Sequence, residues 1–535
     1  MAHAQQNTQN TWRCTRLNAA GVNTIGDILA ASARQYADRI AIVGYHQGLN
    51  FRTIDRLTNK FANALRTFGR AHGGRVGVLL ANRWEYAVAY FGIARAGFTS
   101  VHIPARFSRS EFEHVLKTMP LEALIIDDGM RDRFNWAAPF LADSRIIIAG
   151  GRTGGEVRML ATLCEEATDD PPDIAIDPGS VSSILFAGSA TGNPRGILHT
   201  HAGRILSSQI ALSHFGLQAD DVIAVTMPLH DTDGLCTWFQ AGVLAGASAV
   251  LLADWDPEVF AAAVSTLHIT CAFVRPAHLA ALIRHPSFDA NRLSSLRLIV
   301  CAGATIHPVL IAAIENALPH ARLVKSYGRA ETGPLFAQEQ AHRRVHPGPI
   351  AHPTIGHPNG RIDVALFVSQ GRRAAVGEIG EIATRGRHVS PGYFGDDAGT
   401  CELYRGGDEW AWTGDLALAD EHGCWTLAGR REDAIMAGGS CVLPFELERI
   451  ARMHPDVTDC AAFSVADAKW GELPAIAVVI RAQSLVGTHE IEALFTGPEI
   501  GPFKRPRAVF IVDALPYSPD GELRRDELRK LVPEY

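Results

Sequence analysis

One segment carries the strongest indication of the fold: Ile184-Leu185-Phe186-Ala187-Gly188-Ser189-Ala190-Thr191-Gly192-Asn193-Pro194-Arg195-Gly196. Its apolar start is typical of a buried strand, and small, hydroxylated and glycine residues follow. Small residues let the backbone approach a polyphosphate, so that successive N–H groups point at its oxygens. Ser189 and Thr191 add hydroxyl donors, and Arg195 adds a fixed positive charge. Because the same residue types favour surface turns, the segment alone leaves phosphate binding and a plain turn equally open.

The bulk composition is that of a globular protein. The chain has 535 residues, 47% hydrophobic and 20% charged, with a net charge of −7. Its length predicts about three or four folding units, and its negative charge argues against a nucleic-acid partner. The nine cysteines contain no CxxC pair, which indicates reduced thiols. Residues 1–23 lack the apolar segment of a signal peptide, and no apolar run approaches the ~20 residues of a membrane span, so we expect a cytoplasmic protein.

Strand-like and helix-like segments alternate up to about residue 330. The expected strands are 76–80, 101–103, 124–126, 146–149, 181–186, 221–225, 249–252 and 298–301. This alternation indicates βαβ units and parallel sheets, which bind ligands beyond the carboxyl ends of their strands. Asn82 is expected to cap a helix over 84–96, which Gly97 would end.

The second half of the chain has a different pattern of predicted elements. Short strands with turns follow residue 355, and from about residue 431 the pattern is a compact mixture of strands and helices. The predicted class is α/β: a large N-terminal domain of parallel α/β layers with a β-rich subdomain, and a small mobile α+β C-terminal domain.

Four more motifs follow the glycine-rich segment in order. They are Cys301-Ala302-Gly303-Ala304-Thr305, Lys325-Ser326-Tyr327-Gly328-Arg329-Ala330-Glu331-Thr332-Gly333, Trp412-Thr413-Gly414-Asp415, and Leu427-Ala428-Gly429-Arg430-Arg431-Glu432-Asp433 followed by Gly438-Gly439. The second motif offers an aromatic face for stacking and an oxygen ligand suited to Mg²⁺. Asp415, in a turn, has the chemistry to accept hydrogen bonds from a ribose diol. Each motif alone is weak, but their order and spacing are specific.

The ordered set resembles the adenylate-forming superfamily of acyl-CoA synthetases, peptide-synthetase adenylation domains and firefly luciferase, from about residue 24 to residue 530. The resemblance implies that a carboxylic acid attacks the α-phosphate of Mg-ATP and gives an acyl adenylate. It further implies that the C-terminal domain then rotates, and that a thiol of CoA or of a phosphopantetheine carrier protein takes the acyl group. The implied domains are 1–430, with the ATP and acyl sites, and 431–535, after a hinge at 430–433 that contains Glu432.

The resemblance also assigns roles to single residues. The implied nucleotide and CoA contacts are Ser189, Thr191, Gly192 and Arg195 for phosphate, Gly303, Ala304 and Tyr327 for adenine, Asp415 and Arg430 for ribose, and Gly438 and Gly439 for the pantetheine tunnel. Catalytic roles fall to Thr191, Glu331 and Arg430, and Glu331 is the expected Mg²⁺ ligand. Solvated loop carboxylates remain the alternative for Glu331 and Asp415.

Several positions depart from the family pattern. In the phosphate loop, Arg195 stands in place of lysine. In the motif around Tyr327, Ala330 stands where the family has a hydroxyl residue. On the acyl side, Asp231 occupies a histidine slot and Arg275 an apolar one. Asp231, Asp233 and Arg275 form either surface charges, a self-contained ion pair, or a polar acyl pocket in which Arg275 binds a second carboxylate.

The most serious departure is Glu522, where the family has a catalytic lysine. A repelling charge there should cost at least the ~3–4 kcal/mol that such electrostatic groups contribute. Arg524 lies on the same face of an extended segment, roughly 6–7 Å away, and could replace the lysine.

The predicted function is therefore ATP-dependent activation of a carboxylic acid and transfer to a thiol. Two alternatives stay open: an adenylation-impaired homologue that uses a preformed adenylate or an unusual acid, and a non-catalytic binding protein.

Overall fold

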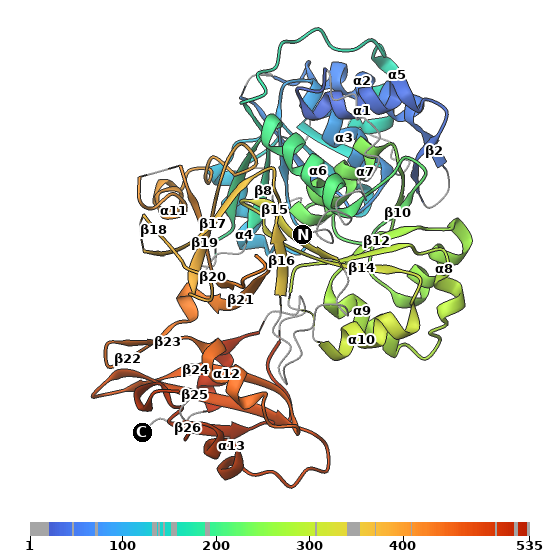
Figure 1. Cartoon of the computed structure of the whole chain (residues 1–535). Helices are drawn as coiled ribbons and strands as arrows, with labels where there is room; N and C mark the ends of the chain where they lie inside the picture. Colours follow the sequence, from blue (N-terminus) through green and yellow to red (C-terminus); the bar gives the residue numbers. More distant parts are fainter. Residues whose placement is uncertain are drawn as a thin grey trace, which may run out of the picture.

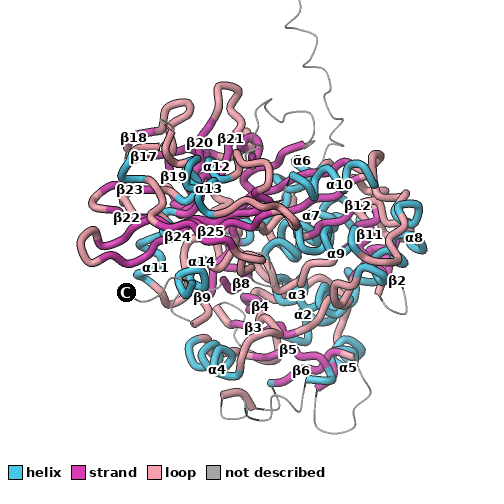
Figure 2. Tube along the Cα trace, turned by 90° about the horizontal axis from the view of Figure 1, so that it is seen from below, coloured by secondary structure: helices cyan, strands magenta, loops and turns pink. Residues whose placement is uncertain are grey.

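The computed structural model describes residues 21–44, 48–69, 73–130, 136, 140–142, 145–150, 158–187, 193–304, 306, 308–339, 354–369, 371–407, 409–497, 500–517 and 523–531. Within these ranges the strands form sheets of seven, fourteen and five strands. Figure 1 shows the two larger sheets in one body and the smallest sheet below it. In Figure 2, seen from below, the small sheet lies in front of that body.

The seven-stranded sheet has the order β7-β6-β5-β3-β4-β8-β9. Its strands are β3 (Arg75–Leu79), β4 (Thr99–His102), β5 (Ala123–Asp127), β6 (Ile146–Ala149), β7 (Arg158–Met159), β8 (Val181–Ala187) and β9 (Arg195–Thr200). All neighbours pair in parallel except β8 and β9, which form an antiparallel pair across the glycine-rich segment. The parallel arrangement predicted for this half of the chain is confirmed.

The fourteen-stranded sheet begins parallel and ends antiparallel. Its first part contains β1 (Ile40–Val43), β2 (Gly48–Asn50), β10 (Val222–Val225), β11 (Ser248–Leu251), β12 (Cys271–Val274), β13 (Leu298–Cys301) and β14 (Arg322–Arg329), which pair in parallel except for the antiparallel pair of β1 and β2 at the edge. The antiparallel part is the predicted β-rich region, with β15 (Gly333–Glu339), β16 (Thr354–Pro358), β17 (Asp363–Ser369), β18 (Arg372–Arg373), β19 (Gly380–Arg385), β20 (Ala411–Ala419) and β21 (Trp425–Arg430). Strand β15 pairs with β14 and joins the two parts.

Helices cover both faces of the large sheets. One group of helices lies between the two large sheets, and its apolar residues form a single buried cluster with strands of both sheets. These helices are α1 (Ile25–Gln35), α2 (Phe51–Leu65), α3 (Trp84–Arg95), α6 (His201–Phe215), the π-helix η3 (Asp233–Phe239) and α7 (Gln240–Ala245). The outer faces carry α4 (Arg109–Thr118) and α8 (Pro257–Leu267), α9 (Pro276–Arg284) and α10 (Pro308–Ala317). Shorter helices are α5 (Leu160–Glu166), η4 (Ala290–Leu293) and α11 (Asp397–Leu403). Helix α3 is buried on every side from residue 85 to residue 95, as expected for a helix between two sheets.

The C-terminal part has its own sheet and core. After η5 (Arg431–Asp433) it contains β22 (Ile435–Ala437), β23 (Ser440–Val442), α12 (Pro444–Ala451), β24 (Val457–Asp467), β25 (Gly471–Ile480), α13 (Thr488–Leu494), η6 (Pro502–Lys504), β26 (Ala508–Ile511), α14 (Arg525–Leu528) and η7 (Arg529–Leu531). Arg525 ties α14 to this core through Glu448, at 2.9 Å, and Asp433, at 3.0 Å. The predicted α/β class, with a small α+β C-terminal part, is confirmed.

Asn82 does not cap α3, contrary to the prediction. The N-cap residue is Arg83, whose side chain makes no capping hydrogen bond. Instead the Asn82 amide donates to the carbonyls of Met227 and Leu252, both at 2.9 Å, and its oxygen accepts from Leu229 N at 2.8 Å. The capping rule considers local partners only, whereas this buried amide satisfies backbone groups at the carboxyl ends of β10 and β11. Asn82 therefore holds the corresponding ends of the two parallel sheets together.

We predict that Asn82→Ala lowers the free energy of unfolding by about 1–3 kcal/mol, because buried carbonyls lose their donor. Urea unfolding of the N-terminal part, followed by tryptophan fluorescence, measures the effect. Asn63→Ala is the matched control, since this exposed amide also donates to two carbonyls, of Thr168 and Asp170, and water can replace it there. Equal shifts in the two variants would contradict the role given to Asn82.

Candidate active site

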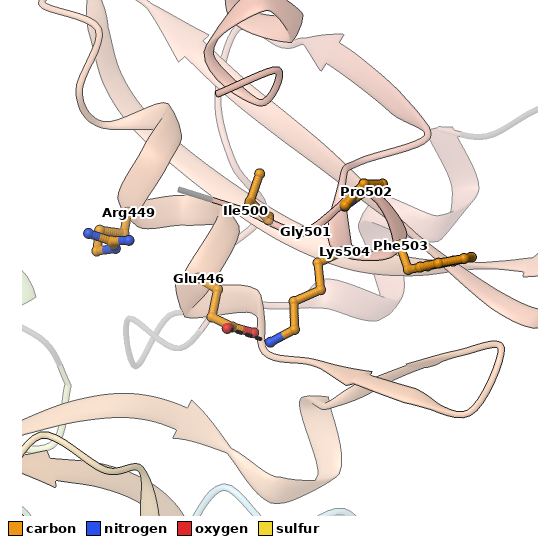
Figure 3. A pocket seen from close by; sticks show the side chains of 7 residues that line it. All are labelled: Glu446, Arg449, Ile500, Gly501, Pro502, Phe503 and Lys504. Carbon is orange, nitrogen blue, oxygen red and sulfur yellow. Dashed lines mark hydrogen bonds and ion pairs between the residues drawn. The ribbon is translucent and has the colours of Figure 1, made fainter. Parts of the chain in front are cut away.

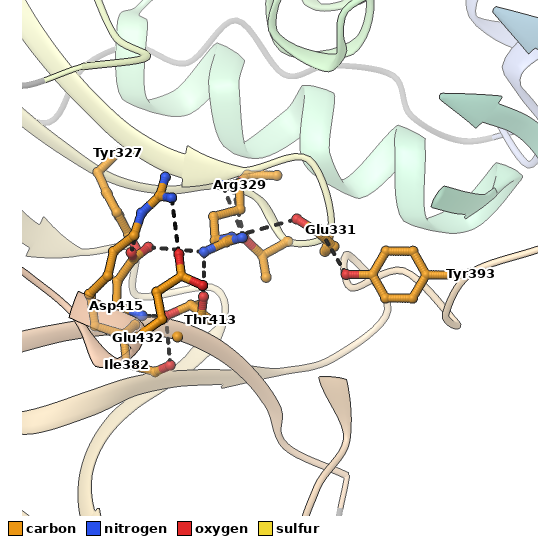
Figure 4. Close-up of polar contacts among 12 residues, drawn as sticks. Tyr327, Arg329, Glu331, Ile382, Tyr393, Thr413, Asp415 and Glu432 are labelled. Carbon is orange, nitrogen blue, oxygen red and sulfur yellow. Dashed lines mark hydrogen bonds and ion pairs between the residues drawn. The ribbon is translucent and has the colours of Figure 1, made fainter. Parts of the chain in front are cut away.

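Tyr327 and Asp415 face each other from β14 and β20. The Tyr327 hydroxyl donates to Asp415 Oδ2 at 2.6 Å, as Figure 4 shows. Burial, followed by the charge of Asp415, raises the pKa of Tyr327 well above its usual value, so the hydroxyl keeps its proton. Gly414 has a φ of +76°, a conformation that glycine adopts without strain, and the 9%-exposed Asp415 follows it inside β20, not in the predicted turn. The second carboxylate oxygen, Oδ1, lies 3.8 Å from Arg430 Nε across the β20–β21 pair.

Arg329 lies between the two carboxylates of the site. Its Nη1 is 3.5 Å from Asp415 Oδ2, its Nε is 3.6 Å from Glu331 Oε2, and it also donates to the carbonyl of Thr413 (Figure 4). Burial alone would lower the pKa of Arg329, but Glu331 and Asp415 raise it above its usual value. The guanidinium therefore stays charged and compensates both carboxylates at once.

Tyr393 connects Glu331 with the phosphate-loop arginine. Its hydroxyl donates to Glu331 Oε1 at 2.8 Å, and the Arg195 guanidinium lies over its ring, 5.6 Å from the centroid. Arg195 also pairs with Asp396 at 3.2 Å. Glu331 is 5% exposed, so its two oxygens are held by Tyr393 and Arg329 on different sides. The predicted phosphate and metal residues Arg195 and Glu331 thus share one aromatic neighbour.

The predicted phosphate contacts Ser189, Thr191 and Gly192 lie outside the described residues, as does Glu522. The strands on either side are described, and their pairing runs from Val181 opposite Thr200 to Ala187 opposite Arg195. The loop that carries these three residues therefore leaves and re-enters the sheet at Ala187 and Arg195, next to the Tyr393 ring.

The acyl-side residues form an ion-pair network. Arg275 Nη2 donates to Asp231 Oδ2 at 3.2 Å, so the predicted pair exists. Arg106 lies 3.7 Å from Asp231 and donates to His230 Nε2 at 3.0 Å. The Arg275 side chain also reaches the predicted adenine-contact residue Gly303, where a Cβ would lie 3.7 Å from Arg275 Cγ. Gly303 has a φ of +88°, and Ala304 follows it on the same turn after β13.

The other predicted residues lie in the C-terminal part. Gly438 and Gly439 make the two-residue turn between β22 and β23, with φ of +55° and +84°. A Cβ on Gly438 would lie 2.7 Å from the Trp470 ring, so glycine allows this ring to cover the turn. The Arg524 side chain pairs with Glu527 at 2.6 Å, away from the cluster around Asp415 that the structure brings together.

Arg329 and Tyr393 are members of this site that the sequence did not reveal. Arg329 lies inside a quoted motif, and its position between Tyr327 and Glu331 was a usable signal. Tyr393 lies 62 residues after Glu331, in a loop without a recognisable pattern, and only the fold brings it close. No helix in the described part of the chain is long and apolar enough to cross a membrane.

Comparison with known proteins identifies relatives over nearly the whole chain. The family model "AMP-binding enzyme" matches residues 29–394, and "AMP-binding enzyme C-terminal domain" matches residues 446–522. A feruloyl-CoA synthase from Amycolatopsis sp is 28% identical, covering 90% of this chain and 94% of the relative. An indoleacetate–CoA ligase from Aromatoleum aromaticum is 27% identical, covering 90% and 93%.

Solved structures show the same fold. The anthranilate CoA ligase AuaEII in complex with anthranoyl-AMP has a TM-score of 0.80 at 24% identity, covering 95% of this chain and 97% of the other. ATP-bound MatB from Rhodopseudomonas palustris has a TM-score of 0.81 at 22% identity, covering 95% and 98%. Together these matches confirm, at the level of the family, the predicted superfamily and its AMP-forming acid–thiol ligase reaction.

The network around Asp231 generates a pH prediction. Burial, with a contribution from Asp231, raises the pKa of Asp233 from 3.8 to about 6. The folded protein therefore holds this proton where the unfolded chain has released it, so stability falls as the pH rises from about 4 to about 6 and stays lowered above that. Asp233→Asn cannot release a proton, so this variant should not lose folding stability as the pH rises through that range.

We expect the thermal midpoint of Asp233→Asn to exceed that of the wild type at about pH 7.5, and the difference to shrink toward about pH 4. Asp220→Asn, an exposed carboxylate before β10, is the control and should show no such trend. A difference that does not vary with pH would contradict the raised pKa.

Proposed function

This chain belongs to the AMP-binding enzyme family, and from that premise we propose that it activates a carboxylic acid with ATP and transfers the acyl group to the thiol of CoA or of a carrier protein. The observation that carries the proposal is the cluster in which Tyr327, Asp415 and Arg430 meet beside Glu331. An aromatic ring, a ribose-type acceptor, a fixed cation and an oxygen ligand lie together where the parallel part of the fourteen-stranded sheet gives way to its antiparallel part.

In this proposal the nucleotide lies along β14. Phe336 packs edge-on against Tyr327 at 5.6 Å and fixes the ring on which adenine stacks, beside the turn at Gly303 and Ala304. Asp415 accepts from the ribose hydroxyls, and Arg430 lies against its outer oxygen. Arg195 and the loop with Ser189, Thr191 and Gly192 bind the terminal phosphates through charge and hydroxyl donors.

The chemistry of the donors fits a magnesium ion that arrives with ATP. The described residues contain no group of three His, Cys, Asp or Glu side chains that could hold a metal. Glu331 supplies one carboxylate, oriented by the Tyr393 hydroxyl, and phosphate oxygens supply further ligands of the kind Mg²⁺ prefers. Bound there, the ion would neutralise charge on the phosphates during adenylate formation.

Rotation about residues 430–433 is required for Arg524 to act as the catalytic cation. Arg524 is more than half exposed and pairs with Glu527, three residues away. Exposed ion pairs of this type contribute only about 0–1 kcal/mol, so exchange of Glu527 for a substrate carboxylate or phosphate costs little. The acidic Glu522 in the usual lysine position favours a second candidate, an adenylation-impaired homologue that accepts a preformed adenylate.

ATP–pyrophosphate exchange over a panel of carboxylic acids tests the proposal. We expect exchange in the wild type and a loss of ~10²–10³ in Arg524→Ala, as for removal of one stabilising group. Lys530→Ala, a nearby cation on the same tail, is the control. Absence of wild-type exchange together with a gain in Glu522→Lys would instead support the adenylation-impaired homologue.

An exposed aromatic pair in the C-terminal part supports CoA as the acceptor. Trp470 is 41% exposed and Phe503 71% exposed, and their rings lie edge to face 6.5 Å apart. Phe503 lines a pocket of about 260 Å³ with Lys504 and Arg449, shown in Figure 3, and Lys504 pairs there with Glu446 at 2.6 Å. A stacking surface beside cations, next to the Gly438 turn of the implied pantetheine tunnel, fits a phosphorylated adenine nucleotide.

We expect Trp470→Ala to raise the KM for CoA by ~10-fold or more, since stacking of one base contributes ~1–3 kcal/mol. Pyrophosphate exchange, which precedes the thiol, should stay at the wild-type rate. Trp255→Ala, remote in sequence beside α8 and packed on His278, serves as the control for loss of a tryptophan. An unchanged KM for CoA would contradict the assignment of Trp470 and Phe503 to the acceptor site.

A further inference from the structure

Arg204, on α6, is a buried cation for which the described residues supply no counter-ion. Its side chain is 0% exposed, and Nη2 makes one long hydrogen bond to Ser207 Oγ, at 3.4 Å. Nε and Nη1 have no hydrogen-bond partner among the described residues, and no described carboxylate pairs with this guanidinium. Buried Arg95 shows the usual arrangement, with an ion pair to Asp55 and hydrogen bonds to Asn59 and the Gly26 carbonyl.

The position of Arg204 places this unpaired charge next to the reaction centre. Ser207 and Ser208 follow at spacings of three and four, so all three share one face of α6. Ser208 Oγ donates to the Cys236 carbonyl of the π-helix η3 at 3.1 Å. A Cβ on Gly333 would lie 2.8 Å from Ser207 Oγ and 4.0 Å from Arg204 Nη2. Gly333 is two residues from Glu331, and η3 begins two residues after the acyl-side Asp231.

The neighbouring titratable groups do not neutralise Arg204. Burial, reinforced by the charge of Arg204, lowers the pKa of His199 well below its usual value and that of His388 to about 4. Tyr90 keeps its proton, because burial raises its pKa, and donates to Gln240 Oε1. A buried charge surrounded by neutral groups is unfavourable unless an anion pairs with it.

We propose that Arg204, with Ser207, binds a second carboxylate of the acid substrate, so that the preferred substrates are dicarboxylic acids. The inference rests on the proposed function of this site. The nucleotide already has its own cations in Arg195, Arg329 and Arg430, whereas Arg204 lies on the face of α6 whose Ser208 hydrogen-bonds to the acyl-side helix η3. A site built to bind a charged group discriminates strongly against analogues that lack it, because its own buried donors are then left unpaired.

Pairs of acids with one skeleton test the proposal by pyrophosphate exchange: adipate against hexanoate, and terephthalate against benzoate. We expect wild-type kcat/KM to favour the diacids, and the diacid-to-monoacid ratio to fall ~10²-fold in Arg204→Met, with partial recovery in Arg204→Lys. An unchanged ratio overturns the proposal. A rise in the KM for ATP in place of the KM for the diacid also overturns it, since the anion would then be phosphate.

Thermal unfolding gives a readout that does not depend on turnover. Without ligand, Arg204→Met should unfold at a higher temperature than the wild type, because an uncompensated buried charge is removed, whereas Arg95→Met should unfold at a lower one. Adipate or terephthalate should raise the midpoint of the wild type but not of Arg204→Met. A loss of stability in Arg204→Met like that in Arg95→Met would show a structural role and overturn the inference.

The two proposals fail in different ways. Exchange with monoacids and no preference for diacids would leave the ligase function standing and refute the Arg204 site. Diacid stabilisation of the wild type, absent in Arg204→Met, without exchange for any acid, would support the Arg204 site and refute the ligase function.

Discussion

The layer of helices buried between the two large sheets determines where functional residues can lie. Helices α3, α6 and α7 contribute to one apolar cluster with strands of both sheets, so neither sheet can shift without opening that core. Asn82 fixes the strand ends against each other through three hydrogen bonds. The loops that follow β10, β12 and β13 are therefore held at one edge, and Asp231, Arg275 and Gly303 come together there.

Much of the fold was predictable, because it follows from local patterns. Short apolar runs separated by helical stretches identified the parallel strands, and Gly97, expected to end the helix over 84–96, follows α3 with a positive φ. The membership of the family was predictable from ordered motifs, although none of them was specific alone. Patterns of this kind succeed when a residue's role is set by its immediate neighbours.

The residues whose roles the sequence did not predict depend instead on contacts with distant segments of the chain. Asn82 fits an N-cap by sequence but satisfies carbonyls more than 140 residues away, and long-range satisfaction of buried groups prevails over a local cap. Tyr393 has no sequence context that points to Glu331. Arg204 lies in a helix whose neighbours are serines and aliphatic residues, and only burial distinguishes it from a solvent-facing arginine. Contacts between distant segments thus account for the part of the site that the sequence did not reveal.

Gly333 has a consequence for how new specificities can arise on this scaffold. A side chain there would collide with Ser207, and its φ of +66° disfavours any other residue, so the turn beside Glu331 is closed to substitution. Divergence of acid preference beside this turn would then fall to the facing helix α6, which carries Arg204, Ser207 and Ser208. Laboratory evolution of this protein should accordingly concentrate its libraries on that one face of α6.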